Sequence, residues 1–359
     1  MSRNTDFYPL KVSAVDADAT DCVLVSFDMP ESLKADFAYQ QGQYLTLKTK
    51  INGEEVRRSY SLCSSPLDDE WRVGIKKVPN GVFSTYANEV LKAGEELEVM
   101  PPDGRFFVGL EPERKGEYVC FAAGSGITPI FSIIKTHLQA EPDASFKLFY
   151  INQTVKSIIL KEELEALKNL YMDRLEIFYF LTQESRSLPL FNGRLDEEKL
   201  EILFKTICEV KEIDDYFLCG PEAMIFMLRD FLMAKGVEKG QIHFELFHTD
   251  SKPSVRRSQL PKEAAGQDAA ITILEGGKSF SFDLPKATDS ILDAALNREA
   301  DLPFACKGGV CCTCRAKLVE GKVDMMVNYA LEDEEIEAGY ILTCQAVPLS
   351  DKVVVDFDA

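Results

Sequence analysis

The chain has 359 residues with 59 Asp and Glu against 40 Lys and Arg, and its net charge of −19 excludes the basic footprint that nucleic-acid binding requires. No apolar run approaches the roughly 20 residues of a membrane span, and the first residues lack the layout of a signal peptide. We therefore expect a cytoplasmic protein without membrane attachment, whose ten cysteines are reduced or bind metal.

A chain of this length predicts two or three domains. Over 1–108, apolar and polar residues alternate in short stretches at 23–27, 44–47 and 71–75, with turn residues between them. This pattern predicts an antiparallel β-barrel with one short helix near 82–90.

Residues 109–248 change to strand–helix alternation, which predicts a parallel α/β sheet flanked by helices. The strand-like runs are 118–122, 146–150, 175–180 and 216–219, and the clearest helical periods are 130–138 and 161–170. The polar stretch 249–268 indicates a linker. The final part, 269–359, is expected to be a small α+β unit with a hairpin at 275–278 and a helix at 290–299.

The last part contains a crowd of cysteines. Cys306, Cys311 and Cys314, with Cys344 after 29 intervening residues, fit the C-x4-C-x2-C…C spacing of plant-type [2Fe–2S] clusters. Cys312 lies between ligands and is expected to point away. The alternative is a zinc site, but zinc sites favour two short C-x2-C pairs, and only one such pair is present. The spacing favours the cluster.

Two short motifs in the barrel region suit a flavin nucleotide. An Arg-x-Tyr-Ser strand could place an aromatic ring on the isoalloxazine and a guanidinium on a phosphate. A Gly-x-x-Ser-Thr segment opens the short helix, where free amides and hydroxyls could bind pyrophosphate. An exposed strand with a surface arginine explains the first motif equally simply. The candidate residues are Arg58, Tyr60, Ser61, Gly81, Ser84 and Thr85.

Three segments of the α/β region suit a nicotinamide nucleotide, although tight turns would explain the glycines as well. A glycine-rich loop joins a strand to a helix, with proline where the dinucleotide fingerprint has its third glycine. No acidic residue follows the second strand, so its polar end could accept a 2′-phosphate, which favours NADPH over NADH. The candidates are Gly124, Gly126, Thr128, Pro129, Thr154, Lys156, Ser157, Arg186, Arg194, Cys219, Gly220 and Pro221.

In this order the modules resemble the ferredoxin–NADP reductase superfamily fused to a plant-type ferredoxin. The resemblance implies FAD on the barrel, a nucleotide on the α/β domain and a β-grasp ferredoxin at 269–359. It places Cys219 beside the nicotinamide, and it places Glu245 and Phe247, on an end-of-domain strand over 243–247, near the flavin. These three residues are the expected catalytic residues, with Cys219 as a positioning contact.

The last domain is also similar to the reductase-subunit family of phenylacetyl-CoA epoxidases, through segments 306–311, 327–332 and 339–345. That resemblance implies electron flow from NADPH through FAD and [2Fe–2S] to a separate oxygenase subunit. Two alternatives stay open: a reductase for another acceptor, such as another oxygenase, a desaturase or the hybrid-cluster protein, and a non-enzymatic electron-carrier module. The acidic run 332–337 either docks a basic partner or is a solvated helix face.

Overall fold

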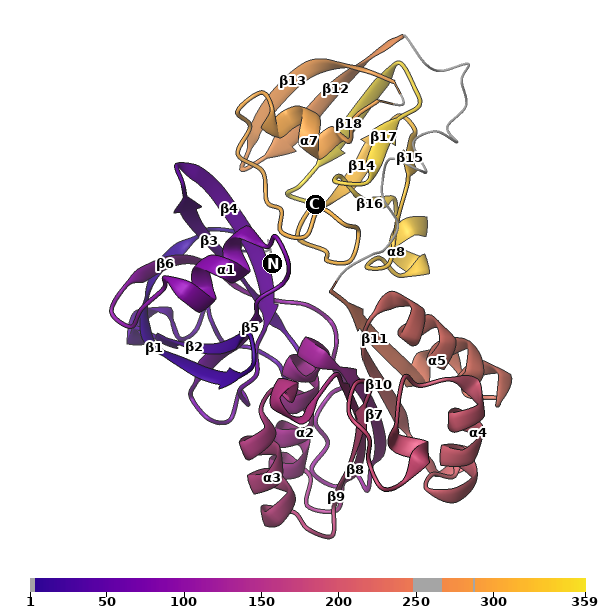
Figure 1. Ribbon diagram of the computed structural model, residues 1–359. Coiled ribbons are helices and arrows are strands. Elements are labelled where there is room, and N and C mark those ends of the chain that lie inside the picture. Colours follow the sequence, from indigo (N-terminus) through magenta and orange to yellow (C-terminus); the bar gives the residue numbers. More distant parts are fainter. Residues whose placement is uncertain (1–3, 248–266, 287) are drawn as a thin grey trace. The chain divides into compact units, whose positions relative to one another are not determined.

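The computed structural model describes residues 4–247, 267–286 and 288–359 (Figure 1). The expected linker at 249–268 lies outside the described residues except for its last two. The chain divides into two compact units, one over Asp6–Phe247 and the other containing the C-terminal segment. None of the helices within the described ranges is long and apolar enough to cross a membrane.

The first part of the Asp6–Phe247 unit is an antiparallel six-stranded sheet in the order β4-β3-β6-β1-β2-β5. A bridge between Leu62 and Val73 joins its two edges, which curls the sheet into the expected barrel. Alternating residues such as Val25, Leu45 and Val99 are fully buried inside it. The elements are β1 (Tyr8–Ala19), β2 (Cys22–Asp28), η1 (Glu31–Leu33), β3 (Tyr44–Ile51), β4 (Glu54–Ser61), β5 (Trp71–Lys76), α1 (Val82–Glu89) and β6 (Glu96–Asp103).

The second part of this unit is a parallel five-stranded sheet in the order β11-β10-β7-β8-β9. Helices α2 and α3 cover one face and α4 and α5 the other (Figure 1). Buried runs such as Tyr118–Ala122 form the central strands, as expected for a sheet covered on both faces. The elements are β7 (Glu117–Ala123), η2 (Gly124–Gly126), α2 (Ile127–Ala140), β8 (Ser145–Asn152), η3 (Val155–Ser157), α3 (Lys161–Leu170), β9 (Leu175–Leu181), η4 (Pro189–Phe191), α4 (Glu197–Thr206), η5 (Val210–Glu212), β10 (Asp215–Gly220), α5 (Glu222–Ala234), η6 (Lys239–Gln241) and β11 (Ile242–Leu246).

The C-terminal unit is a mixed sheet in the order β13-β12-β18-β14-β16, in which only β12 and β18 are parallel, with α7 packed on its core. This is the expected β-grasp arrangement. Helix α7 is shorter than the predicted 290–299, and Glu299, three residues after its end, takes a positive φ of 64° that no helix continues through. The elements are β12 (Asp268–Glu275), β13 (Lys278–Pro285), α7 (Ile291–Leu296), β14 (Arg315–Glu320), β15 (Val323–Met325), α8 (Asp333–Glu337), β16 (Tyr340–Leu342), β17 (Ala346–Pro348) and β18 (Lys352–Asp356).

Candidate functional site

The flavin motif of the barrel lies on β4 and reaches the parallel sheet. Ser61 is buried, and its Oγ donates a hydrogen bond to Glu245 Oε2 at 3.1 Å. The Tyr60 ring is half-buried, 5.6 Å from the ring of Phe83 in α1. Arg58 is exposed and donates to a neighbouring backbone carbonyl at 2.6 Å. Two predicted site residues that are distant in sequence, Ser61 and Glu245, are therefore in contact.

Helix α1 begins at Gly81, and no side chain caps it, so its first amides point out of the helix without a capping partner. A Cβ on Gly81 would lie 2.3 Å from Ser84 Oγ, so the approach of the chain to the helix requires glycine. Ser84 is buried and donates to the Gly81 carbonyl at 3.3 Å, while Thr85 is half-buried one residue further along. The helix start next to Tyr60 can thus bind an anionic phosphate.

The glycine-rich loop is the short helix η2, between β7 and α2. Gly124 takes a positive φ of 54°, and a Cβ on Gly126 would lie 2.2 Å from the Cys219 carbonyl oxygen. Thr128 is buried, and its Oγ1 donates to a loop carbonyl at 2.9 Å. Pro129 is buried in the first turn of α2, where its missing N–H leaves no hydrogen bond unmade. This explains why proline stands where the fingerprint has glycine.

Cys219, Gly220 and Pro221 lie at the carboxyl end of β10, at the same sheet edge as the glycine loop. Cys219 is fully buried, and burial, followed by the charge of Glu245, raises the pKa of its thiol. A neutral thiol is not a nucleophile, which agrees with a positioning contact. A Cβ on Gly220 would lie 2.9 Å from Ala123 Cβ, so β10 and the loop pack closely. Pro221 is exposed before α5.

Strand β11 carries Glu245 and ends before Phe247. Glu245 pairs with Cys219 in the parallel ladder and accepts the hydrogen bond from Ser61. The expected strand over 243–247 stops at Leu246, and the Phe247 side chain beyond it is 38% exposed. Cys219, Glu245 and Ser61 therefore form one group, drawn from β10, β11 and β4.

Sequence analysis missed Lys76, the last residue of β5. Its Nζ lies 3.4 Å from the position of a Cβ on Gly124, so a barrel lysine stands beside the glycine loop of the other module. An ammonium next to a helix start that binds phosphate adds a charge-assisted contact. Only the docking of the barrel on the parallel sheet brings Lys76 to this loop, and no local sequence signal predicts it.

The turn after β8 is where the 2′-phosphate is expected. Ser157 Oγ accepts from the Thr154 amide at 3.0 Å and donates to its carbonyl at 2.8 Å, so this hydroxyl stabilises the turn itself. Lys156 is exposed. Glu184 Oε2 accepts a hydrogen bond from the Val155 amide at 3.2 Å. A carboxylate that sequence analysis missed therefore stands at this turn.

The two arginine candidates lie on the loop between β9 and α4. Arg186 and Arg194 are both exposed. Asn192 holds the loop through an Arg186 amide contact of 2.6 Å and a bond from its Nδ2 to the Arg186 carbonyl of 3.1 Å. Because Glu184 comes from the same loop, acidic and basic groups lie together near the turn, and either sign can meet the ribose.

The four predicted cluster ligands form two pairs. Cys306 is half-buried, and Cys311, Cys314 and Cys344 are 7%, 1% and 4% exposed. Side-chain hydrogen bonds link Cys306 with Cys311 and Cys314 with Cys344. The contact with Cys311 lowers the pKa of Cys306 to about 7, which favours a thiolate ligand. Cys312 donates elsewhere, to a backbone carbonyl at 3.2 Å, as predicted.

Two cysteine pairs suit two iron atoms, each taking two thiolates. Within the described ranges, no three His, Cys, Asp or Glu side chains are arranged around a single metal position. One tetrahedral zinc would require four donors around one centre. The donor set therefore fits a [2Fe–2S] cluster better than zinc.

The loop backbone bends around these sulfurs at Lys307 and Gly309, with φ of 52° and 75°. A Cβ on Gly309 would lie 2.7 Å from a backbone oxygen, so only glycine fits there. The Gly308 amide donates to Cys306 Sγ at 3.3 Å. Gln345 Nε2 donates to the Lys307 carbonyl at 2.9 Å and ties the loop to the segment of the fourth ligand. The backbone thus encloses the sulfurs and supplies them with a hydrogen-bond donor.

The acidic run 332–337 forms most of α8. Glu332 and Glu335 make a capping box, and Glu335 forms an ion pair of 2.6 Å with Arg315 of β14. Glu334 and Glu337 are exposed. One carboxylate of the run is therefore structural, and the others leave an acidic surface.

Three family models match successive parts of the chain: an oxidoreductase FAD-binding domain over 9–108, an oxidoreductase NAD-binding domain over 121–230 and a 2Fe-2S iron-sulfur cluster binding domain over 273–349. One of the subunits of 1,2-phenylacetyl-CoA epoxidase from Escherichia coli (strain K12) is 43% identical over 355 residues, 99% of both chains. The ferredoxin reductase component of 3-ketosteroid-9-alpha-monooxygenase from Rhodococcus rhodochrous is 33% identical over 354 residues, 97% of this chain and 96% of the relative. The chain belongs to this family of oxygenase reductases.

The fold of this reductase is that of phthalate dioxygenase reductase, with a TM-score of 0.62 at 23% identity over 98% of both chains. The predicted fold class is confirmed: a flavin β-barrel, a parallel α/β nucleotide domain and a C-terminal ferredoxin domain. The reductase is an oxidoreductase with domains for FAD, a nicotinamide nucleotide and a [2Fe–2S] cluster, as expected. Its relatives are reductase components of oxygenases.

Proposed function

We propose that this reductase passes electrons from NADPH through FAD and a [2Fe–2S] cluster to the oxygenase subunit of a phenylacetyl-CoA epoxidase. The observation that carries the electron-input part is the hydrogen bond of 3.1 Å between Ser61 and Glu245, beside Cys219. It joins the flavin motif to the sheet edge where nucleotides bind in open α/β folds. The acceptor is supported by the identity of 43% with the Escherichia coli epoxidase component over both whole chains.

FAD, when bound, supplies the conversion between a two-electron hydride donor and one-electron acceptors. On the barrel side, the β4 motif orients the ring system and the α1 start binds its phosphates. On the sheet side, the glycine loop binds the nucleotide phosphates together with Lys76. The proposed flavin ligands are Arg58, Tyr60, Ser61, Gly81, Ser84 and Thr85. The proposed nucleotide ligands are Gly124, Gly126, Thr128, Pro129, Thr154, Ser157, Gly220 and Pro221.

Cys219 has a positioning role in this proposal. Its buried, neutral thiol offers a compact surface at the carboxyl end of β10 without attacking the nicotinamide ring. Glu245 is held by Ser61 and brings a carboxylate to the junction. Phe247, exposed beyond β11, is proposed to cover the flavin once the cofactor is bound. The cluster is assigned to Cys306, Cys311, Cys314 and Cys344.

The proposed domain division is 1–108 for FAD, 109–248 for the nucleotide, 249–268 for the linker and 269–359 for the ferredoxin. The family matches over 9–108, 121–230 and 273–349 fall inside these three domains and support the division. Expression of 1–248 alone, followed by a flavin spectrum, tests the boundary: a folded flavoprotein supports it, and an insoluble or flavin-free product contradicts it.

The nucleotide preference has a specific competitor. Lys156 and Arg186 favour NADPH, because cations at the turn after β8 would attract a 2′-phosphate. Glu184, whose carboxylate meets the Val155 amide at 3.2 Å, favours NADH, because a carboxylate accepts ribose hydroxyls and repels phosphate. Glu184→Gln separates the two: a gain in NADPH affinity or no change supports NADPH, and a selective loss of NADH affinity supports NADH.

The whole proposal is tested by anaerobic titration of the purified protein with each nucleotide, followed by mixing with candidate oxygenase subunits. The expected result is bleaching of flavin and then cluster absorbance, with electrons appearing in the phenylacetyl-CoA oxygenase. A protein without flavin absorbance, or unbleached by both nucleotides, would support the electron-carrier alternative. Transfer to another oxygenase alone would support the relationship to the 3-ketosteroid-9-alpha-monooxygenase component instead.

A further inference from the structure

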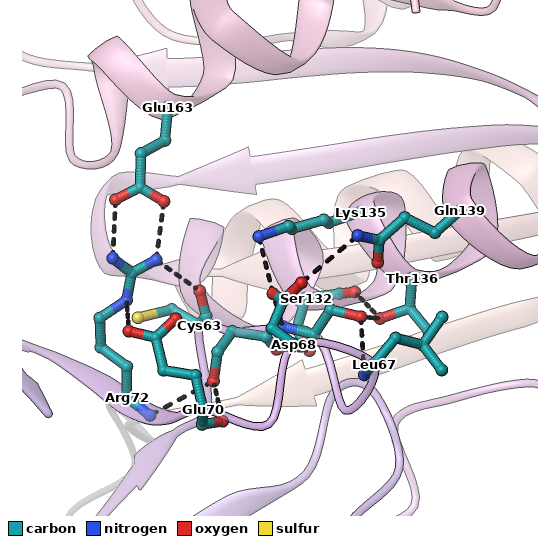
Figure 2. Close-up of polar contacts among 12 residues, drawn as sticks. Cys63, Leu67, Asp68, Glu70, Arg72, Ser132, Lys135, Thr136, Gln139 and Glu163 are labelled. Carbon is teal, nitrogen blue, oxygen red and sulfur yellow. Dashed lines mark hydrogen bonds and ion pairs between the residues drawn. The ribbon is translucent and has the colours of Figure 1, made fainter. Parts of the chain in front are cut away.

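One face of helix α2 is fastened to the barrel by polar side chains. Ser132, Lys135, Thr136 and Gln139 stand at i, i+3, i+4 and i+7, which places them along one helix face. All four reach the barrel segment that follows β4 (Figure 2). We call these four residues and their partners on that segment, Ser64, Ser65 and Asp68, the α2 seam.

The centre of the α2 seam is dry. Ser132 Oγ donates to the Ser64 carbonyl at 2.6 Å, and Thr136 Oγ1 lies 2.9 Å from Ser65 Oγ, with all four residues fully buried. Hydrogen bonds at this depth have no water to replace them, so their geometry is enforced.

The rim of the seam is an ion pair. Lys135 Nζ lies 2.7 Å from Asp68 Oδ2, and Gln139 donates to the other oxygen at 3.3 Å. Although burial favours the neutral acid, the bonds from Lys135 and the Ser65 amide hold the pKa of Asp68 below its usual value. Asp68 is therefore a carboxylate across the neutral pH range.

A second contact lies beside the seam, between β5 and α3. Arg72 donates twice to Glu163, at 2.9 and 2.7 Å, in a bidentate pair (Figure 2). The Arg72 side chain is only 14% exposed. Glu163 lies in the first turn of α3, where the helix dipole also favours its charge. We call this pair the Arg72–Glu163 clamp.

The clamp belongs to a row of contacts along β5. Residues 72, 74 and 76 share one side of the strand because side chains alternate. Arg72 meets Glu163, a Cβ on Gly74 would lie 2.7 Å from Thr128 Cγ2, and Lys76 lies beside Gly124. One side of β5 thus runs from α3 past the start of α2 to the glycine loop.

We propose that the α2 seam and the Arg72–Glu163 clamp are positioning elements that set the angle between the flavin barrel and the nucleotide sheet. The seam fixes α2, whose first residues follow the glycine loop, and Asp68 and Arg72 lie on the chain just after the flavin motif. Apolar contacts from barrel residues such as Leu24 and Phe106 hold the two modules together. Apolar contact tolerates sliding, whereas bidentate and buried hydrogen bonds have one geometry.

The consequence concerns hydride transfer, in which the nicotinamide gives two electrons and one proton to the flavin. Neither contact touches the predicted nucleotide ligands, so the affinity for nucleotide should not depend on them. The transfer rate should, because a misplacement of about 1 Å between reacting groups can lower a rate by about 10²-fold. The inference rests on the reductase assignment and adds residues that act through the docking of two modules.

The test uses the full-length holoenzyme and Glu163→Gln, which keeps the shape of the side chain and removes its charge. Glu165→Gln is the matched control, because Glu165 lies on the same helix and forms an ion pair of 2.9 Å with Lys161. We expect flavin bleaching at saturating nucleotide to slow by about 10- to 100-fold in Glu163→Gln, with the nucleotide Kd within about twofold of wild type. Glu165→Gln should change neither quantity.

Rescue separates positioning from general damage. Arg72→Glu should be slow, and the double variant Arg72→Glu with Glu163→Arg should recover most of the lost rate. Should either Arg72 variant fail to fold, Asp68→Asn carries the same test on the seam, with the same expected split between rate and Kd. Amide hydrogen exchange of 64–72 and 161–170 without nucleotide should be faster in Glu163→Gln than in the control.

Three results would overturn the proposal. The first is an unchanged bleaching rate in both Glu163→Gln and Asp68→Asn. The second is a charge swap that folds without recovering the rate. The third is a rise in Kd that accounts for the whole effect, which would make these residues part of nucleotide binding and leave the reductase assignment itself intact.

Discussion

Gly126→Ala tests the packing of the glycine loop against β10 most directly. Gly126 has φ −60° and ψ −10°, which alanine adopts without strain, so any effect is steric. The added Cβ would lie 2.2 Å from the Cys219 carbonyl oxygen and 2.6 Å from its carbon. Both are backbone atoms of a central strand, so the loop must move by about 1 Å, and overpacking of this kind costs about 1–3 kcal/mol.

Two measurements report this cost. For a unit of this size, each kcal/mol lowers the Tm by about 2–4 °C. A displaced loop should also lose one or two amide contacts to phosphate, which weakens oxidised nucleotide by about 10- to 100-fold in a flavin difference titration. Gly240→Ala is the control, because its added Cβ would meet nothing within 4 Å. A Gly126→Ala protein with the Tm and affinity of wild type would refute the close approach of loop and strand.

Four further variants test the assigned residues. Cys344→Ser should abolish the visible and EPR signals of the cluster while nucleotide still bleaches the flavin, and loss of both would contradict the modular division. Lys156→Ala with Arg186→Ala should weaken NADPH more than NADH, and equal weakening would refute the 2′-phosphate assignment. Lys76→Met should weaken both nucleotides alike by about tenfold, because it removes one charge-assisted contact, and titrations showing a selective loss would place Lys76 elsewhere. Burial raises the pKa of Cys219, so its thiol stays protonated up to pH 9, and Cys219→Ala should leave the shape of the pH–rate profile of flavin reduction unchanged.

Sequence predicted the features that local rules specify. The cysteine spacing is set by the few ways in which one loop can bring thiolates to two irons, so the four ligands could be named without a structure. Strand alternation and helix periodicity are equally local, which is why α3 was predicted at its observed bounds. Cys312 could be set aside because four ligands were already available, and its sulfur bonds to a backbone carbonyl.

What could not be predicted depends on contacts between modules. Lys76 and Glu184 gain their meaning only when β5 meets the glycine loop and the loop after β9 meets the turn after β8. Ser157 was assigned to the nucleotide because hydroxyls bind phosphate, yet its hydroxyl also closes its own turn. Pattern rules identify which groups are present, whereas competition among partners is a property of the folded chain.

The junction of flavin and nucleotide sites combines two kinds of constraint. Cys219 and Glu245 are held together by the parallel ladder of β10 and β11, which backbone hydrogen bonds fix. Ser61 reaches them from a different sheet, so its bond to Glu245 depends on how the barrel docks. The electron-input geometry therefore lies wholly within Asp6–Phe247, and the proposed acceptor surface lies wholly in the C-terminal unit. A change of oxygenase partner can be made there without altering hydride transfer, and a change of nucleotide can be made at the turn after β8 without altering the cluster.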